Sequence, residues 1–209
     1  ATYERILRNI AGFRVEVHCT VTRQMAGRPG YLEEFLRFWS DRPEISKIIV
    51  SLYTPQRGEI SSERLTPDDR ASVVADLLEL RGRFPKLAMA ESLIRAFLEP
   101  PSAPSECMFA RTTETFSADL ETKITPCQFG GNPACSECGC VASAGLHAIS
   151  THRIAGVVRV GGIYEASLRV GSIHELAQYE PGVAGEVAGV ADLVGARVVD
   201  RIGDRLVDD

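Results

Sequence analysis

The sequence predicts an α/β fold with parallel strands, followed by a smaller cysteine-rich part and a helical tail. The first half alternates helix and strand patterns in the order α-β-α-β-α, which favours parallel strands joined by right-handed crossovers. Prolines cluster at Pro100, Pro101 and Pro104, and the composition changes there. Five of the six cysteines follow this break, so we place the main boundary of the chain at it.

Two helix-strand pairs open the chain. Apolar residues recur at helical spacing over residues 2–10 and again over residues 31–39. Residues 13–22 alternate with period two, and residues 46–55 form a β-branched run that is typical of a buried strand. The sequence therefore predicts helix, strand, helix and strand, in that order.

A third helix is predicted from Thr66, which is a good N-cap residue and is followed by Pro67 and Asp69 in the first turn. Its core stripe consists of Val73, Val74, Leu77 and Leu78. A short helix is expected between residue 85 and the proline break. Because two parallel strands can neither cover both their faces nor close a barrel, further strands are expected upstream of this sequence.

The second half is predicted to begin with a β-hairpin that turns at residues 119–121, followed by the cysteine-rich loop. Beyond residue 142 the chain mixes glycine with apolar residues. Gly161 and Gly162 are predicted to form a turn, since they lack the spacing of a phosphate-binding loop. Residues 186–209 are predicted to form an amphipathic helix.

Composition narrows the class of protein. The chain has 209 residues, 44% of them hydrophobic, and a formal net charge of -5 from interspersed charges, so nothing resembles a nucleic-acid-binding surface. No apolar run approaches the roughly 18 residues of a spanning helix, and no signal-peptide pattern is present at the N-terminus. We expect the protein to be located in a reducing cytoplasm. Clustered cysteines there more often bind metal or perform redox chemistry than form disulfides.

The late cysteines are the strongest functional signal. They are Cys107, Cys127, Cys135, Cys138 and Cys140. Their density and the glycines around them favour an iron–sulfur cluster, because thiolates are its ligands and close backbone amides can point at sulfur. A tetrahedral zinc site is the alternative, although zinc ribbons usually carry two Cys-x-x-Cys pairs and this chain has one. A thioredoxin-like redox pair is a further alternative, but the pair does not sit within a βαβ unit.

The lone Cys19 shares the first strand with His18, and alternation places the two on opposite faces. We expect Cys19 to be a small buried hydrophobe. His147, His152 and His174 are not needed as ligands, because five cysteines already exceed the four ligand positions of one cluster.

The stretches "VEVHCTVTRQ" and "IIVSLYTPQRGE", and above all Cys107 with "FSADLETKITPCQFGGNPACSECGCVASAGL", resemble the C-terminal half of a radical S-adenosylmethionine protein with a SPASM- or Twitch-like auxiliary cluster domain. The resemblance implies three parts. Residues 1–104 would be the C-terminal part of a partial (β/α)6 barrel, residues 105–150 the auxiliary domain, and residues 151–209 a mostly helical extension.

The resemblance also implies ligands and partners. Four of the five late cysteines would hold an auxiliary four-iron four-sulfur cluster, and Thr20, Thr22, Ser51 and Tyr53 would line the cofactor and substrate cavity, with Arg23 and Gln56 nearby. The full-length enzyme would bind S-adenosylmethionine on a second four-iron four-sulfur cluster and take electrons from a reductant such as flavodoxin or ferredoxin. Its substrate is unknown.

Two departures from the family pattern qualify this expectation. The 209 residues contain no Cys-x-x-x-Cys-x-x-Cys loop for the catalytic cluster, so we expect this chain to be part of a longer enzyme and inactive alone. Thr122 stands where the family signature has a glycine before the second hairpin cysteine. Full SPASM domains carry seven cysteines for two auxiliary clusters, so five favour one cluster. The alternative function is a zinc-stabilised binding module without catalysis.

Overall fold

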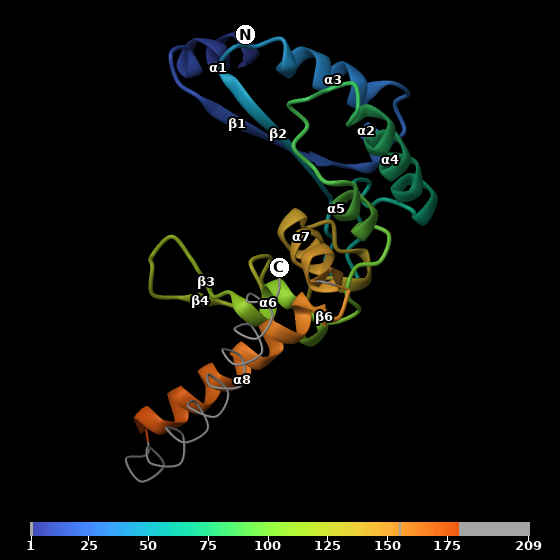
Figure 1. The fold of residues 1–209 in the computed structure, drawn as a ribbon. Helices are drawn as coiled ribbons and strands as arrows, with labels where there is room; N and C mark the ends of the chain where they lie inside the picture. Colours follow the sequence, from blue (N-terminus) through green and yellow to red (C-terminus); the bar gives the residue numbers. More distant parts are fainter. Residues whose placement is uncertain (1, 155, 180–209) are drawn as a thin grey trace, which may run out of the picture. The chain divides into compact units, whose positions relative to one another are not determined.

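The computed structural model describes residues 2–154 and 156–179, which form a mixed α/β chain (Figure 1). The chain divides into two compact units, residues 1–149 and 150–209, which are described separately below. Within the described ranges, no helix is both long and apolar enough to cross a bilayer.

The first unit opens with the predicted order of helices and strands. Its elements up to the proline break are α1 (Thr2–Ile10), β1 (Val15–Val21), α2 (Arg23–Ala26), α3 (Tyr31–Ser40), β2 (Ile45–Leu52), α4 (Pro67–Leu80) and α5 (Glu91–Ala96). The two strands pair in parallel, with Val17 opposite Ile48 and Thr20 opposite Ser51, as the α-β-α-β-α order predicts.

A third extended segment continues this sheet. The Ile48 N–H donates to the Lys86 carbonyl at 2.7 Å, and the Ala88 N–H donates to the Ile48 carbonyl at 3.1 Å, so residues 86–88 run parallel to β2. The short helix predicted before the proline break is confirmed as α5, which begins at Glu91, whereas the pairing of residues 86–88 with β2 was not predicted. The segment is too short to show strand alternation, and its pairing partner is distant in sequence.

One face of the sheet is buried under helices. Alternate residues of the strands pack with the apolar stripes of α3 and α4 into the main core, which contains Cys19, Val21, Leu32, Leu36, Trp39, Ile48, Val50, Leu52, Val73, Val74 and Leu77 (Figure 1). On the opposite face of β1, Glu16, His18 and Thr20 are exposed. The sheet is therefore apolar on its covered face and polar on the other along β1.

The rest of the first unit carries the cysteines. Its elements are η1 (Pro104–Glu106), α6 (Met108–Thr112), β3 (Thr115–Phe116), β4 (Lys123–Ile124), η2 (Cys135–Glu137) and α7 (Val141–Thr151), whose last two residues extend past Ile149. The antiparallel pairing of β3 with β4, which sets Thr115 opposite Ile124, confirms the predicted hairpin.

Asp119 organises the turn of this hairpin. Its Oδ1 atom accepts bonds from the backbone N–H groups of Glu121 and Thr122 and from the Ser117 hydroxyl, while Oδ2 accepts from the Thr122 hydroxyl. These hydrogen bonds, led by those from the Ser117 and Thr122 side chains, hold the pKa of Asp119 far below its usual range. Thr122 therefore stabilises the turn of this hairpin through its N–H group and its hydroxyl.

The described part of the second unit is a short hairpin and a helix. The hairpin pairs β5 (Arg153–Ile154) with β6 (Val158–Arg159), and α8 (Val160–Tyr179) follows directly. The predicted turn at Gly161 and Gly162 is wrong, because both residues lie in the first turn of α8. The helix predicted over residues 186–209 lies outside the described residues.

The N-terminus of α4 has a full capping box. The Thr66 Oγ1 atom accepts from the Asp69 N–H at 3.1 Å, and the Asp69 carboxylate accepts from the Thr66 N–H at 2.9 Å. We expect Thr66→Ala to lower the free energy of unfolding by about 1 kcal/mol in urea titrations, since it leaves a helix N–H without its partner. Ser72→Ala, on the exposed side of the same helix, is the control and should change stability little. Equal effects of both variants would contradict the cap assignment.

Cys19 is a buried thiol of the core, as predicted, and is 5% exposed. Burial raises its pKa from 9.0 to about 11, so ionisation favours the unfolded chain once the pH passes about 9. Between pH 8 and pH 10 this linkage should lower the free energy of unfolding by on the order of 1 kcal/mol. Cys19→Ala should not show this decrease. Urea titrations at both pH values measure the difference. Val21→Ala, which shortens a buried non-titrating neighbour, should keep the wild-type pH dependence, and a loss of that dependence in this variant would refute the assignment.

Candidate metal centre

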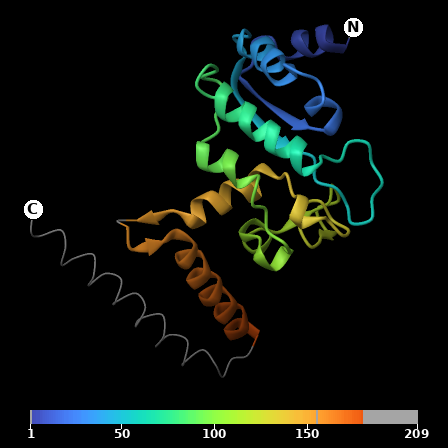
Figure 2. The same ribbon diagram turned by 90° about the vertical axis from the view of Figure 1, so that its right-hand side faces the viewer.

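The cysteine loop, residues 127–140, docks along the chain that follows β2. Its backbone pairs with residues 52–57 through the bonds Leu52 N–H to Gly139 O (2.9 Å), Ala134 N–H to Pro55 O (2.8 Å) and Arg57 N–H to Asn132 O (2.8 Å). Figure 2 shows the two segments next to each other, the yellow cysteine loop beside the teal loop that leaves β2. The carboxyl end of β2 therefore positions the cysteines.

Gly139 is the point of closest approach between this loop and β2. A Cβ atom on residue 139 would lie 2.1 Å from the Leu52 carbonyl oxygen, so only glycine fits there. The Gly139 N–H also donates to Thr54 Oγ1 at 2.8 Å. Because its neighbours are Cys138 and Cys140, this contact sets where both of those thiols lie.

Gln56 holds the other end of the loop. Its Oε1 atom accepts from the Asn132 N–H at 2.7 Å, and it lies close to Gly131, where φ is +59°. Proposed from the sequence as a neighbour of the cavity, Gln56 contacts the loop instead. Together with Gly139 it fixes the loop at two points on the chain after β2.

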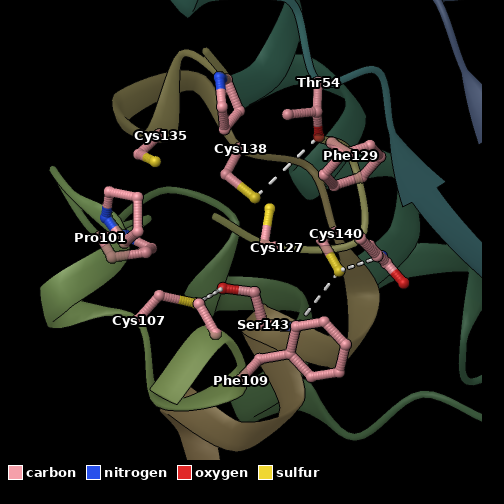
Figure 3. A pocket seen from close by; sticks show the side chains of 14 residues that line it. Thr54, Pro101, Cys107, Phe109, Cys127, Phe129, Cys135, Cys138, Cys140 and Ser143 are labelled. Carbon is pink, nitrogen blue, oxygen red and sulfur yellow. Dashed lines mark hydrogen bonds between the residues drawn. The ribbon is translucent and has the colours of Figure 1, made fainter. Parts of the chain in front are cut away.

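All five late cysteines line one cavity of the first unit. Other side chains around it include Thr54, Pro101, Phe109, Gln128, Phe129 and Ser143. Figure 3 shows the sulfur atoms of Cys127 and Cys138 directed toward one another, with Cys107, Cys135 and Cys140 around them. All five thiols are free, and the cavity encloses about 20 Å³, room for about one water molecule. The fold thus gathers thiols that are up to 33 residues apart.

Polar groups surround three of these sulfur atoms. Cys140 Sγ accepts from Gln128 Nε2 at 3.1 Å and from the Ser143 N–H at 3.5 Å, at the start of α7. Cys107 Sγ lies 3.2 Å from the Ser143 hydroxyl. The Thr54 hydroxyl lies 4.0 Å from Cys138 Sγ. Donors around sulfur stabilise thiolates and tune the potential of thiolate-bound clusters.

Burial disfavours the thiolate form of several of these cysteines. It raises the pKa of Cys138 to about 11 and also raises the pKa values of Cys135 and Cys140. Backbone N–H groups near Cys140 act in the opposite direction but do not overcome burial. Metal binding would have to displace the thiol protons, so it should release protons and strengthen with pH.

Arg70, which the sequence patterns did not indicate, is a buried group that contacts the loop backbone directly. It is 9% exposed and lies on the core-facing stripe of α4. Its guanidinium donates to the carbonyls of Phe97 (2.9 Å), Cys138 (3.0 Å) and Glu137 (2.5 Å). The only feature of the sequence that could have indicated this burial is its spacing: Arg70 lies three residues before Val73, and therefore on the same face of the helix as the apolar stripe.

The four residues predicted to line a cavity fall at the carboxyl ends of β1 and β2. Thr20 and Ser51 are register partners on the polar face, where Ser51 Oγ also lies 2.7 Å from His18 Nε2. Thr22 is the N-cap residue of α2, and its hydroxyl donates to Gln24. Tyr53 donates to Glu59 at 2.5 Å, and this bond leads the causes that raise its pKa. The structure thus brings Thr20 and Ser51 together, and the other two are engaged locally.

Ser51 connects the polar sheet face to the cysteines. Its Oγ atom accepts from the Val141 N–H at 3.3 Å, directly after Cys140. Arg23, also proposed as a cavity neighbour, instead pairs with Asp69 at 3.5 Å on α4. The contacts of Ser51 with His18 and with the Val141 N–H thus connect the exposed face of β1 to the backbone beside the cysteine cavity.

The side chains have the chemistry of a thiolate-ligated centre, but their positions are not those of metal ligands. Five soft sulfur ligands converge on one largely buried cavity with N–H and O–H donors around them. Over the ranges that the structure describes, no three His, Cys, Asp or Glu side chains stand ready to hold a metal ion. A bound cluster would therefore require the thiols to rearrange around it.

No protein-family model, curated protein or solved structure matches this chain.

Gly139 offers a direct test of the loop docking. Gly139→Ala should lower the free energy of unfolding by about 2 kcal/mol, because its Cβ would overlap the Leu52 carbonyl and force the loop from β2. Urea titration measures the loss. Gly82→Ala is the matched control, since its Cβ would lie 3.9 Å from the nearest atom outside its neighbours. If the two variants were equally stable, the close approach would not be a feature of the protein in solution.

Proposed function

We propose that four of the five late cysteines bind a four-iron four-sulfur cluster, and that the chain is the C-terminal part of a radical S-adenosylmethionine enzyme. The observation that carries this proposal is the convergence of all five thiols on one cavity at the carboxyl end of β2. When bound, the cluster would supply electron transfer or an iron atom that anchors substrate. The substrate of the enzyme is left open.

Within this proposal the parallel strands belong to a partial (β/α)6 barrel. The third parallel segment at residues 86–88 and the polar side chains of the exposed β1 face support that interpretation. Thr20, Thr22, Ser51 and Tyr53 would lie at the mouth of the barrel, near S-adenosylmethionine. The catalytic cluster would be held by a part of the enzyme outside this sequence, since these 209 residues have no Cys-x-x-x-Cys-x-x-Cys loop.

The chain's own residues would hold and shield the cluster. Cys107, Cys127, Cys135 and Cys138 are the proposed ligands. Cys138 is preferred over Cys140 because it forms a Cys-x-x-Cys pair with Cys135, a common spacing of cluster ligands, so Cys140 would be a neighbour. Pro101 and Phe109 line the cavity and would limit water access. A protein reductant such as flavodoxin or ferredoxin would supply electrons to the full enzyme in a reducing cytoplasm.

A zinc-stabilised binding module is the second candidate, favoured by the same observation, since zinc also takes four thiolates. Colour separates the two. Anaerobic reconstitution with iron and sulfide should give a brown protein with about four iron atoms per chain if the cluster proposal holds. A colourless protein that retains zinc and incorporates no iron would favour the binding module.

Cysteine substitutions test the proposed ligands. Cys107→Ala, Cys127→Ala, Cys135→Ala and Cys138→Ala should each lower the iron content of the reconstituted protein, because each removes a thiolate ligand. Cys140→Ala should retain it. Cys19→Ala, which removes a buried thiol from the sheet core, is the control for lost packing and should also retain iron. If Cys107→Ala kept full iron while Cys140→Ala lost it, the cluster would be held by the contiguous loop from Cys127 to Cys140.

A further inference from the structure

Arg70 is a buried cation that supports the cysteine loop from the side of α4. Its three hydrogen bonds all go to backbone carbonyls, and two of these belong to Glu137 and Cys138 in the loop. Carbonyl oxygens satisfy the N–H donors of a guanidinium but carry no formal charge. The positive charge is therefore buried with hydrogen-bond partners and without a counter-ion from those partners.

The neighbouring carboxylates are engaged elsewhere. Glu137 turns its carboxylate to Arg64 at the exposed rim, and Asp69 caps α4 and pairs with Arg23. Among residues 2–154 and 156–179, no carboxylate lies within 4.0 Å of the Arg70 guanidinium. Burial lowers the pKa of Arg70, and the Glu137 carboxylate offsets this only from beyond pairing distance. A further negative charge nearby would therefore stabilise the buried cation.

The cysteine cavity is where that charge would arise. Four thiolates outweigh the positive charge of the metal centre they ligate, so a loaded site is anionic. Cys138 lines the cavity, and its carbonyl oxygen accepts a hydrogen bond from the Arg70 guanidinium. The buried cation is thus attached to the backbone of a cavity thiol.

We propose that Arg70 is an electrostatic positioning residue that supplies the counter-charge of the thiolate centre and raises its reduction potential. This inference rests on the proposed cluster function. Reduction adds a negative charge to the cluster, and a fixed cation in a low-dielectric surrounding favours the reduced form over the oxidised form. Arg70 would act through the field of its charge, without ligating the metal.

The experiment compares three variants of the full chain after anaerobic reconstitution with iron and sulfide. Arg70→Gln removes the charge and keeps an amide donor, while Arg70→Lys keeps the charge. Arg64→Gln is the matched control, because it removes an exposed cation that also binds Glu137. Midpoint potentials are measured by redox titration, followed by absorbance and electron paramagnetic resonance.

Arg70→Gln should lower the equilibrium constant for reduction of the cluster at least tenfold. This change corresponds to a midpoint potential at least 59 mV more negative for one electron. Arg70→Lys and Arg64→Gln should each stay within that margin of wild type. A purely structural role for Arg70 would lower stability but leave the potential of the loaded protein in place, so an unchanged midpoint in Arg70→Gln overturns the inference.

The outcomes separate this inference from the proposed function. If wild-type protein binds no iron, the cluster proposal itself fails. If wild type loads iron and Arg70→Gln has the wild-type midpoint, only the role of Arg70 fails. Where Arg70→Gln does not fold, Arg70→Met, which removes the charge and keeps an unbranched side chain, decides: a fall of 59 mV or more supports the role of the charge, and a wild-type midpoint overturns it.

Discussion

The pairing of the cysteine loop with the chain after β2 is the interaction on which the site depends. Backbone bonds at Leu52, Pro55 and Arg57 attach the loop to the core, and Gly139 allows an approach that any side chain would block. Arg70 then fixes the loop carbonyls from α4. The cysteines consequently gain defined positions from a rigid α/β scaffold, although they lie on irregular backbone.

The same docking gives the cavity its electrostatic character. Burial disfavours thiolates, and this is why the pKa of Cys138 rises to about 11 in the metal-free chain. Hydrogen bonds from the Thr54 hydroxyl to Cys138 and from backbone N–H groups near Cys140 act in the other direction. Neutral thiols and a buried cation are a costly combination, whereas an anionic metal centre would balance that cation. Stability and metal loading are therefore coupled in the proposed function.

Local patterns in the sequence predicted most helices and both strands of the main sheet. Thr66 and Asp69 formed the predicted cap because capping needs only residues a few positions apart. The hairpin at residues 115–124 was predicted for the same reason. The segment at residues 86–88 was missed because its only strand partner is Ile48, far away in the chain. Gly161 and Gly162 were misplaced because their intrinsic preference for turns does not prevent them from entering a helix.

By itself, the sequence determined the α/β order, the burial of Cys19 and the concentration of five thiols in one stretch, since each follows from periodicity, composition or spacing. Only the tertiary structure decided that these thiols share a cavity, that Ser51 links them to His18, and that Arg70 is buried against their backbone. Such contacts join residues tens of positions apart, so no local pattern encodes them. They arise when the loop packs on β2 and α4, because buried N–H and carbonyl groups must then find partners.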